Sequence, residues 1–104
     1  KGRQISKPGV SMHDLDDAVM NILEDSNYKE FIVHKTGHGL GMDVHEDPYI
    51  MRKNYELLEE GMVITVEPGL YRDGYLGIRI EDDVMITNKG CKSLTSFDRN
   101  LRVI

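Results

Sequence analysis

Three of the chain's four histidines fall within twelve positions of one short stretch, residues 31–48. They are His34, His38 and His45, and Gly37, Gly39 and Gly41 lie between them. Neutral imidazole binds divalent metals and also transfers protons near neutral pH. The glycines indicate backbone that turns tightly or approaches another segment closely. The stretch is therefore either a chemical site or a glycine-rich loop with incidental histidines, and its composition alone leaves both interpretations open.

Charged residues also interrupt two apolar stretches further along the chain. Glu67 ends the run 62–67, and the sequence then reads Ile78-Arg79-Ile80-Glu81. In an extended strand, Arg79 and Glu81 would share one face. A solvated sheet face would explain these charges equally well. Two glutamates and a histidine would also suit manganese, cobalt, iron or zinc, and a bridging carboxylate can hold two such ions ~3.5–4 Å apart.

One amphipathic helix is predicted before these residues. Ser11, with Asp14 three residues later, resembles a capping box. Apolar side chains then recur at helical spacing: Leu15, Ala18, Val19, Ile22 and Leu23. This pattern predicts one buried helix face. Neighbouring residues on a helix point in different directions, so Asp16 and Asp17 are expected on a solvated face rather than as paired ligands. The helix should end at residues 26–27.

Strands are predicted around and after the histidines. Runs rich in β-branched and aromatic residues cover 31–33, 62–67 and 77–87, with a brief continuation at 70–71. Turns are expected at 59–61, 73–74 and 88–90. Leu57 and Leu58 are expected either in one helical turn or as a hydrophobic anchor. Cys91 directly follows the last turn, and a structural role suits it better than a nucleophilic one.

Composition limits the class of protein. The chain has 104 residues, a net charge of -5 and 39% hydrophobic residues, which indicates a single small globular domain. An acidic chain without a basic face argues against nucleic-acid binding. One cysteine allows neither a disulfide framework nor a thiolate zinc site. No apolar run reaches membrane-span length, and a cytoplasmic location is expected. The first residue is Lys1, which indicates a piece of a longer protein.

Three sequence blocks, taken together, resemble the pita-bread metallopeptidases, the family of methionine aminopeptidase, prolidase and aminopeptidase P. The blocks are G-H-G-L-G-M-D-V-H-E-D-P at 37–48, E-G-M-V-I-T-V-E-P-G-L-Y at 60–71, and G-I-R-I-E-D-D-V at 77–84. The last two are similar to the Xaa-Pro branch, prolidase and aminopeptidase P. The resemblance implies an α+β fold in which residues 1–104 form the C-terminal half of the catalytic domain, with one amphipathic helix followed by antiparallel strands.

The resemblance also implies roles for individual residues. His38, Glu67 and Glu81 would be metal ligands, with Glu81 bridging two ions and Glu67 also moving the proton. His45 would contact the scissile carbonyl and stabilise the tetrahedral intermediate. His34 would line the substrate site, and Arg79 would hold the carboxylates in place.

The implied activity is hydrolysis of a peptide with proline at its second position, by water activated between two divalent ions. Manganese is expected, with cobalt, zinc or iron as alternatives. Family members also use two aspartates from an earlier D-x-G segment, which this chain lacks. The chain alone is therefore expected to be inactive and to self-associate, and its parent to be a homodimer. A non-catalytic binding module and a creatinase-like metal-free hydrolase are the alternatives.

Overall fold

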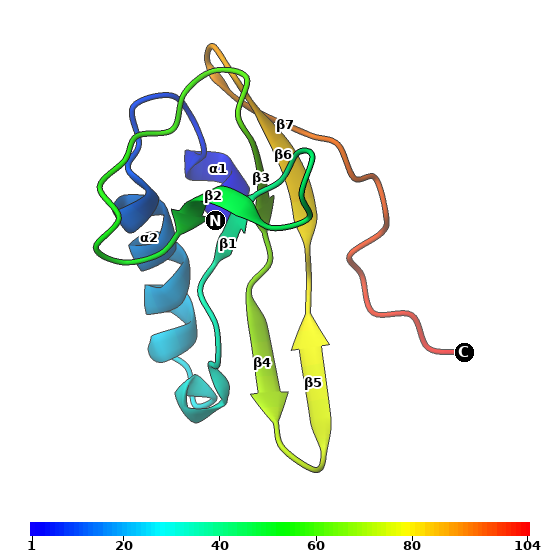
Figure 1. The fold of residues 1–104 in the computed structure, drawn as a ribbon. Coiled ribbons are helices and arrows are strands. Elements are labelled where there is room, and N and C mark those ends of the chain that lie inside the picture. The colour runs from blue at the N-terminus through cyan, green and yellow to red at the C-terminus, as the bar shows by residue number, and fades with distance from the viewer.

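A helical layer lies against one face of an antiparallel sheet, and a two-stranded hairpin extends beyond that sheet (Figure 1). The computed structural model describes residues 1–104. Two helices, α1 (Gly2–Ile5) and α2 (Met12–Glu24), come first, and a 3-10 turn, η1 (Lys29–Phe31), follows them. All the strands come later. The predicted α+β class, one amphipathic helix followed by antiparallel strands, is confirmed.

Five strands form the main sheet in the order β2-β1-β3-β6-β7, and every neighbouring pair is antiparallel. Their bounds are β1 Gly37–Gly39, β2 Glu46–Ile50, β3 Val63–Val66, β6 Asp82–Thr87 and β7 Gly90–Ser93. The hairpin consists of β4 (Gly69–Arg72) and β5 (Leu76–Arg79). β3, from the second sequence block, lies between β1 of the histidine stretch and β6 of the third block. The sheet therefore brings together the three blocks that carry the candidate ligands.

Helix α2 forms where the sequence predicts it. The hydroxyl of Ser11 caps its first turn by accepting the backbone N–H of Asp14 at 3.0 Å. Of the predicted apolar stripe, Leu15 and Val19 lie in the hydrophobic core, whereas Ile22 is 56% exposed and the prediction is wrong there. The core residues are Met12, Leu15, Val19, Ile50, Leu58, Ile64, Val66, Val84 and Ile86. Leu58 is thus a hydrophobic anchor, one of the two states expected for the pair, whereas Leu57 is 52% exposed.

The alternation in β3 separates the core from the other face of the sheet. Ile64 and Val66 belong to the core against α2. Successive side chains of a strand point to opposite faces, so Thr65 and the following Glu67 lie on the face away from the helix. The same alternation in β6 buries Val84 and Ile86. His38, Thr65 and Glu67 therefore lie together on the sheet face opposite α2.

Two strand predictions are wrong. Residues 31–33 form no strand, because Phe31 closes the 3-10 turn with its N–H on the Tyr28 carbonyl at 2.9 Å. The run 77–87 is two strands rather than one. β5 pairs with β4, and β6 pairs with β3. The break between β5 and β6 lies opposite the break between their partner strands β4 and β3. Pro68 lies in that second break and has no N–H to donate to a ladder.

Asp16 corrects a third prediction, since it is buried rather than on a solvated face. Its side chain is only 4% exposed. One carboxylate oxygen accepts the backbone N–H of Thr36 at 2.8 Å, and the other accepts that of Arg52 at 3.0 Å. Asp16 thereby connects α2 to the segment that leads into β1. No helix of the structure is both long enough and apolar enough to cross a membrane.

Candidate active site

His38 lies at the centre of β1, on the polar face of the sheet. Its side chain is almost fully buried. Nδ1 lies 2.8 Å from the carbonyl oxygen of Gly39, and a carbonyl can only accept a hydrogen bond. Nδ1 therefore carries the proton in the neutral ring. Nε2 faces the Glu67 carboxylate, which can also only accept, so a proton or a cation must lie between these two atoms.

Glu67 follows the last residue of β3. Its backbone N–H donates to the carbonyl of Thr36 at 2.8 Å, which fixes the point where the chain leaves the sheet. The carboxylate turns back toward β1, and its Oε1 lies 2.9 Å from Nε2 of His38. Thr65 also donates to Oε1, at 2.8 Å. The two predicted ligands that are 29 residues apart in the sequence, His38 and Glu67, are thus in direct contact.

Arg79 and Glu81 lie beside this pair. The Arg79 guanidinium is 2.9 Å from Glu81 Oε2 and 3.7 Å from Glu67 Oε2. The charge of Glu81 is the largest cause of a raised pKa for Arg79, and Glu67 and Tyr71 add to it against the opposing effect of burial. The guanidinium therefore stays charged and links the two carboxylates. This contact is the one expected if Arg79 holds carboxylates in place.

The other two histidines lie at the edge of this cluster. The His45 ring is 4.4 Å from that of His38 between ring centroids, and the side chain is exposed. His34 instead pairs with Tyr71, whose hydroxyl lies 2.9 Å from Nε2. The second ring nitrogen of His34 lies 2.8 Å from the Lys35 carbonyl. His45 therefore lies next to a candidate ligand, whereas the contacts of His34 are with Tyr71 and the backbone.

The donor set fits a divalent cation in part. When Nε2 of His38 carries no proton, it and the Glu67 carboxylate are both electron-pair donors, and they lie 2.9 Å apart in a buried position. Adjacent ligands of one metal ion, each at about 2.1 Å, lie about 3.0 Å apart in octahedral and about 3.4 Å apart in tetrahedral geometry. Imidazole and carboxylate together suit a borderline or hard divalent ion. No group of three or more His, Cys, Asp or Glu side chains gathers as a full ligand set, and the contact described for Glu81 is with Arg79.

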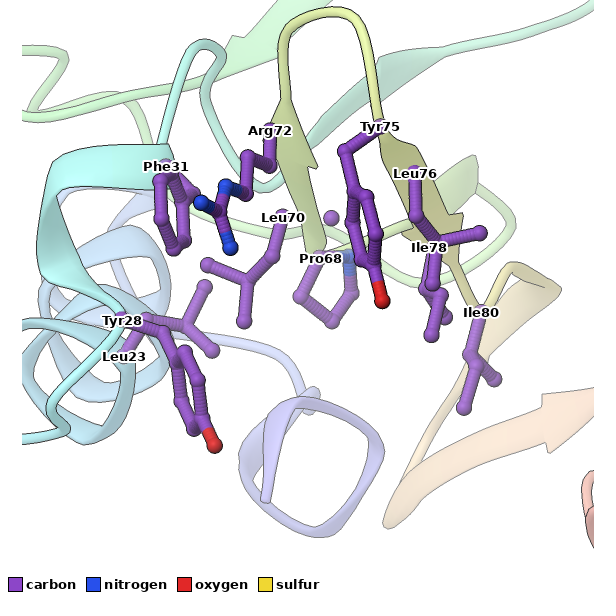
Figure 2. A pocket seen from close by; sticks show the side chains of 11 residues that line it. Leu23, Tyr28, Phe31, Pro68, Leu70, Arg72, Tyr75, Leu76, Ile78 and Ile80 are labelled. Carbon is purple, nitrogen blue, oxygen red and sulfur yellow. The ribbon is translucent and has the colours of Figure 1, made fainter.

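An apolar groove opens on the face of the hairpin opposite to the one where Arg79 contacts the carboxylates (Figure 2). It has a volume of about 530 Å³. We call it the hairpin groove. It is lined by Leu23, Tyr28, Phe31, Pro68, Gly69, Leu70, Arg72, Tyr75, Leu76, Ile78 and Ile80. Ile78 and Ile80 line it while Arg79 contacts the carboxylates, as the predicted alternation requires.

Two polar residues of the cluster were not among the predicted site residues. Thr65 could have been found from the sequence, because it precedes Glu67 by two positions in a strand and must share its face. No sequence signal places Tyr71 against His34, since that contact joins residues 37 positions apart. Cys91 is no additional site. Burial raises the pKa of its thiol, and its Sγ lies 3.2 Å from the carbonyl of Arg3, in keeping with the expected structural role.

Known proteins are similar to this chain in both sequence and fold. An uncharacterized peptidase of Staphylococcus aureus (strain USA300) is 45% identical over 96 residues, which are 92% of this chain and 27% of the relative. The prolidase of Pyrococcus horikoshii is 42% identical with a TM-score of 0.93, over 97% of this chain and 29% of that one. An Xaa-Pro dipeptidase from Bacillus anthracis is 35% identical with a TM-score of 0.94, over 99% of this chain and 29% of the dipeptidase chain.

These similarities confirm the expected fold, the C-terminal part of the pita-bread fold seen in prolidases. The chain spans only about 27% of the length of the curated relatives that it matches. Residues 1–88 match the sequence model of metallopeptidase family M24. With this match over most of its length, the chain belongs to metallopeptidase family M24.

Proposed function

We propose that residues 1–104 are the C-terminal part of the catalytic domain of an Xaa-Pro peptidase. The substrate would be a peptide with proline at its second position, cleaved at the bond next to that proline. The observation that carries the proposal is the buried contact of His38 with Glu67, which Arg79 joins to Glu81. Support comes from the similarity to a prolidase and an Xaa-Pro dipeptidase.

Each residue of the site has a role in this proposal. His38, Glu67 and Glu81 would hold two divalent ions, with manganese the preferred metal and cobalt, zinc or iron as alternatives. When bound, the ions supply Lewis acidity at the carbonyl and lower the pKa of water. Glu67 would take the proton of the attacking water and pass it to the leaving amine.

The remaining residues would orient and stabilise. His45, next to His38, would donate to the negative charge that develops on the scissile carbonyl oxygen. His34 would line the substrate site in the orientation that Tyr71 gives it. Arg79 would hold the two carboxylates in place.

The ligand set of this chain would be completed by two aspartates from a preceding half of the domain. Isolated residues 1–104 would then bind manganese or cobalt weakly and cleave nothing. The parent would be a cytoplasmic homodimer. Calorimetric titration of manganese into the isolated chain, with an Xaa-Pro dipeptide assay alongside, tests this division of the site. Robust turnover by the pure 104-residue chain would contradict it.

The decisive experiment uses the full-length protein that contains these residues. We expect Ala-Pro to be hydrolysed in the presence of manganese, Ala-Ala to be a poor substrate, and chelation to abolish the activity. Glu67→Gln should reduce kcat by at least about 100-fold, in line with the loss of a general base. Glu60→Gln, an exposed change in the turn before β3, is the matched control and should act like the wild type.

The two alternative functions give different results in the same assay. A protein that binds manganese or Xaa-Pro peptides but hydrolyses no Xaa-Pro peptide would be a non-catalytic binding module. Hydrolysis that survives complete chelation would indicate a metal-free hydrolase of the creatinase type. Either result would overturn the proposed function.

A further inference from the structure

Thr65 occupies the middle of β3, between two residues of the hydrophobic core. Its side chain points to the opposite face, toward His38 and Glu67, and is only 2% exposed. A buried hydroxyl costs free energy unless it is hydrogen-bonded. Valine has nearly the same shape and an equal or greater preference for strands. The strand therefore has no need for the hydroxyl, and its presence calls for another reason.

The hydroxyl of Thr65 connects the two candidate ligands. The backbone N–H of His38 donates to it at 3.0 Å, and the hydroxyl lies 2.8 Å from Glu67 Oε1. A backbone N–H can only donate, so the hydroxyl must accept there. Its single proton then goes to the nearest acceptor, Glu67 Oε1, because the carbonyl of His38 is more distant at 3.4 Å. The direction of both hydrogen bonds is thereby set.

We propose that Thr65 is a positioning residue: its hydroxyl fixes the β1 backbone at His38 and the Glu67 carboxylate together, so that the two meet a divalent cation preformed. This inference rests on the proposed function. Without the hydroxyl, Glu67 would lose the hydrogen bond that orients Oε1, and the N–H of His38 would lose its side-chain acceptor. Partners of this kind typically change metal affinity by about 10–100-fold.

The test is a cobalt titration of the full-length protein, followed by the visible absorption of the bound ion. Thr65→Val should raise the cobalt Kd by about 10-fold or more and alter the absorption bands. Thr65→Ser, which keeps the hydroxyl, should bind within about 3-fold of the wild type. Thr87→Val is the matched control, since Thr87 ends β6 half-buried and away from His38 and Glu67, and it should bind like the wild type.

Unfolding of the metal-free variants, followed by circular dichroism, shows whether Thr65→Val folds. If it does not, Thr65→Ala against Thr65→Ser makes the same comparison, because both lack the methyl group and only serine keeps the hydroxyl. Equal cobalt affinity with and without the hydroxyl would overturn this inference alone. Equal weakening by valine and serine would also overturn it, because the methyl group would then be responsible. A wild-type protein that takes up no cobalt would overturn the proposed function, and this inference with it.

Discussion

Asp16 shows how one buried carboxylate can organise the approach to the site. Both of its oxygens accept backbone N–H groups, from Thr36 and from Arg52. The carbonyl of Thr36 in turn accepts the N–H of Glu67. A chain of hydrogen bonds therefore runs from α2 through the segment before β1 to the residue proposed to move the proton. Its members lie far apart in the sequence and meet only in the folded chain.

Replacing Asp16 by asparagine should be strongly destabilising for so small a change. The amide offers one oxygen and one NH₂ group, so one of the two backbone donors would face another donor. An unsatisfied buried donor costs about 1–3 kcal/mol, and the free energy of unfolding should fall by this amount. Urea denaturation measures it. Asp25→Asn at the exposed end of α2 is the control, with an expected change below about 0.5 kcal/mol. Equal stability of the two variants would contradict the role given to Asp16.

At the scale of elements, the separation of β1 and β3 determines whether His38 can reach Glu67. Gly37 makes this separation possible. A Cβ built on it would overlap the backbone carbonyl of Thr65, and backbone cannot move aside as a flexible side chain can. The glycine at this position therefore reflects close approach of two strands rather than a turn.

Gly37→Ala should force β1 and β3 apart. Overpacking of this kind costs about 1–3 kcal/mol, and the unfolding free energy should decrease accordingly. Gly90→Ala is the matched control within the same sheet, because its added Cβ would meet open space. Its effect should stay within about 1 kcal/mol. Thermal or urea unfolding compares the two, and a tolerated Gly37→Ala with a damaging Gly90→Ala would refute the argument.

The end of β2 is connected to α2 by a second, exposed set of contacts. The Arg52 guanidinium bonds Glu24 and Asp17 on the helix, as well as Asn21. Hydrogen bonding to Asn21 and then Arg52 lowers the pKa of Asp17, and hydrogen bonding to Arg52 lowers that of Glu24. A carboxylate with a lowered pKa stabilises the fold above its unfolded pKa and loses that contribution as the pH falls through its folded pKa.

Arg52→Ala should therefore reduce stability in a pH-dependent way. Near pH 7 its Tm should lie below that of the wild type, by a few degrees or less because exposed ion pairs contribute little. The gap should narrow as the pH falls below the ordinary values of 3.8 and 4.5 for Asp17 and Glu24. Melting curves between pH 7 and pH 3 measure this. A gap of constant size across that range would show that packing, not charge, is responsible.

At the scale of the whole molecule, the hairpin groove is an apolar surface that is left open. Leu76 and Ile78 on β5 are each more than half exposed, and they line the groove together with side chains from α2 and η1 (Figure 2). Exposed apolar surfaces of this kind favour association.

The isolated 104-residue chain should self-associate through this surface. Sedimentation velocity should show a weight-average mass that rises with concentration. Leu76→Lys should reduce the association, because it places a charge in the groove. Val44→Lys is the control, since Val44 is exposed in the loop between β1 and β2 and lies outside the groove. A single monomer species at all concentrations, with cooperative melting, would contradict this prediction.

Much of the fold could be predicted from local pattern. The capping serine and the spacing of Leu15 and Val19 located α2, and the alternation at 78–81 separated Arg79 from Ile78 and Ile80. These features depend on residues close in the sequence, for which periodicity is sufficient. The strand predicted at 31–33 failed for the opposite reason, since its backbone meets no partner strand and closes a local turn instead.

The sequence by itself determined which residue types are available for chemistry. His38 and Glu67 stood out by type and position, alternation put Arg79 and Glu81 on one strand face, and the family resemblance implied the role of each. Only the tertiary structure decided which of them meet: His38 with Glu67, Glu81 with Arg79, and His34 with Tyr71. It also decided that Asp16 is buried and that the Thr65 hydroxyl lies between two ligands. The physical reason is that a hydrogen bond forms only when donor and acceptor are placed to within about a few tenths of an ångström. No local periodicity encodes the distance between two segments that are far apart in the sequence.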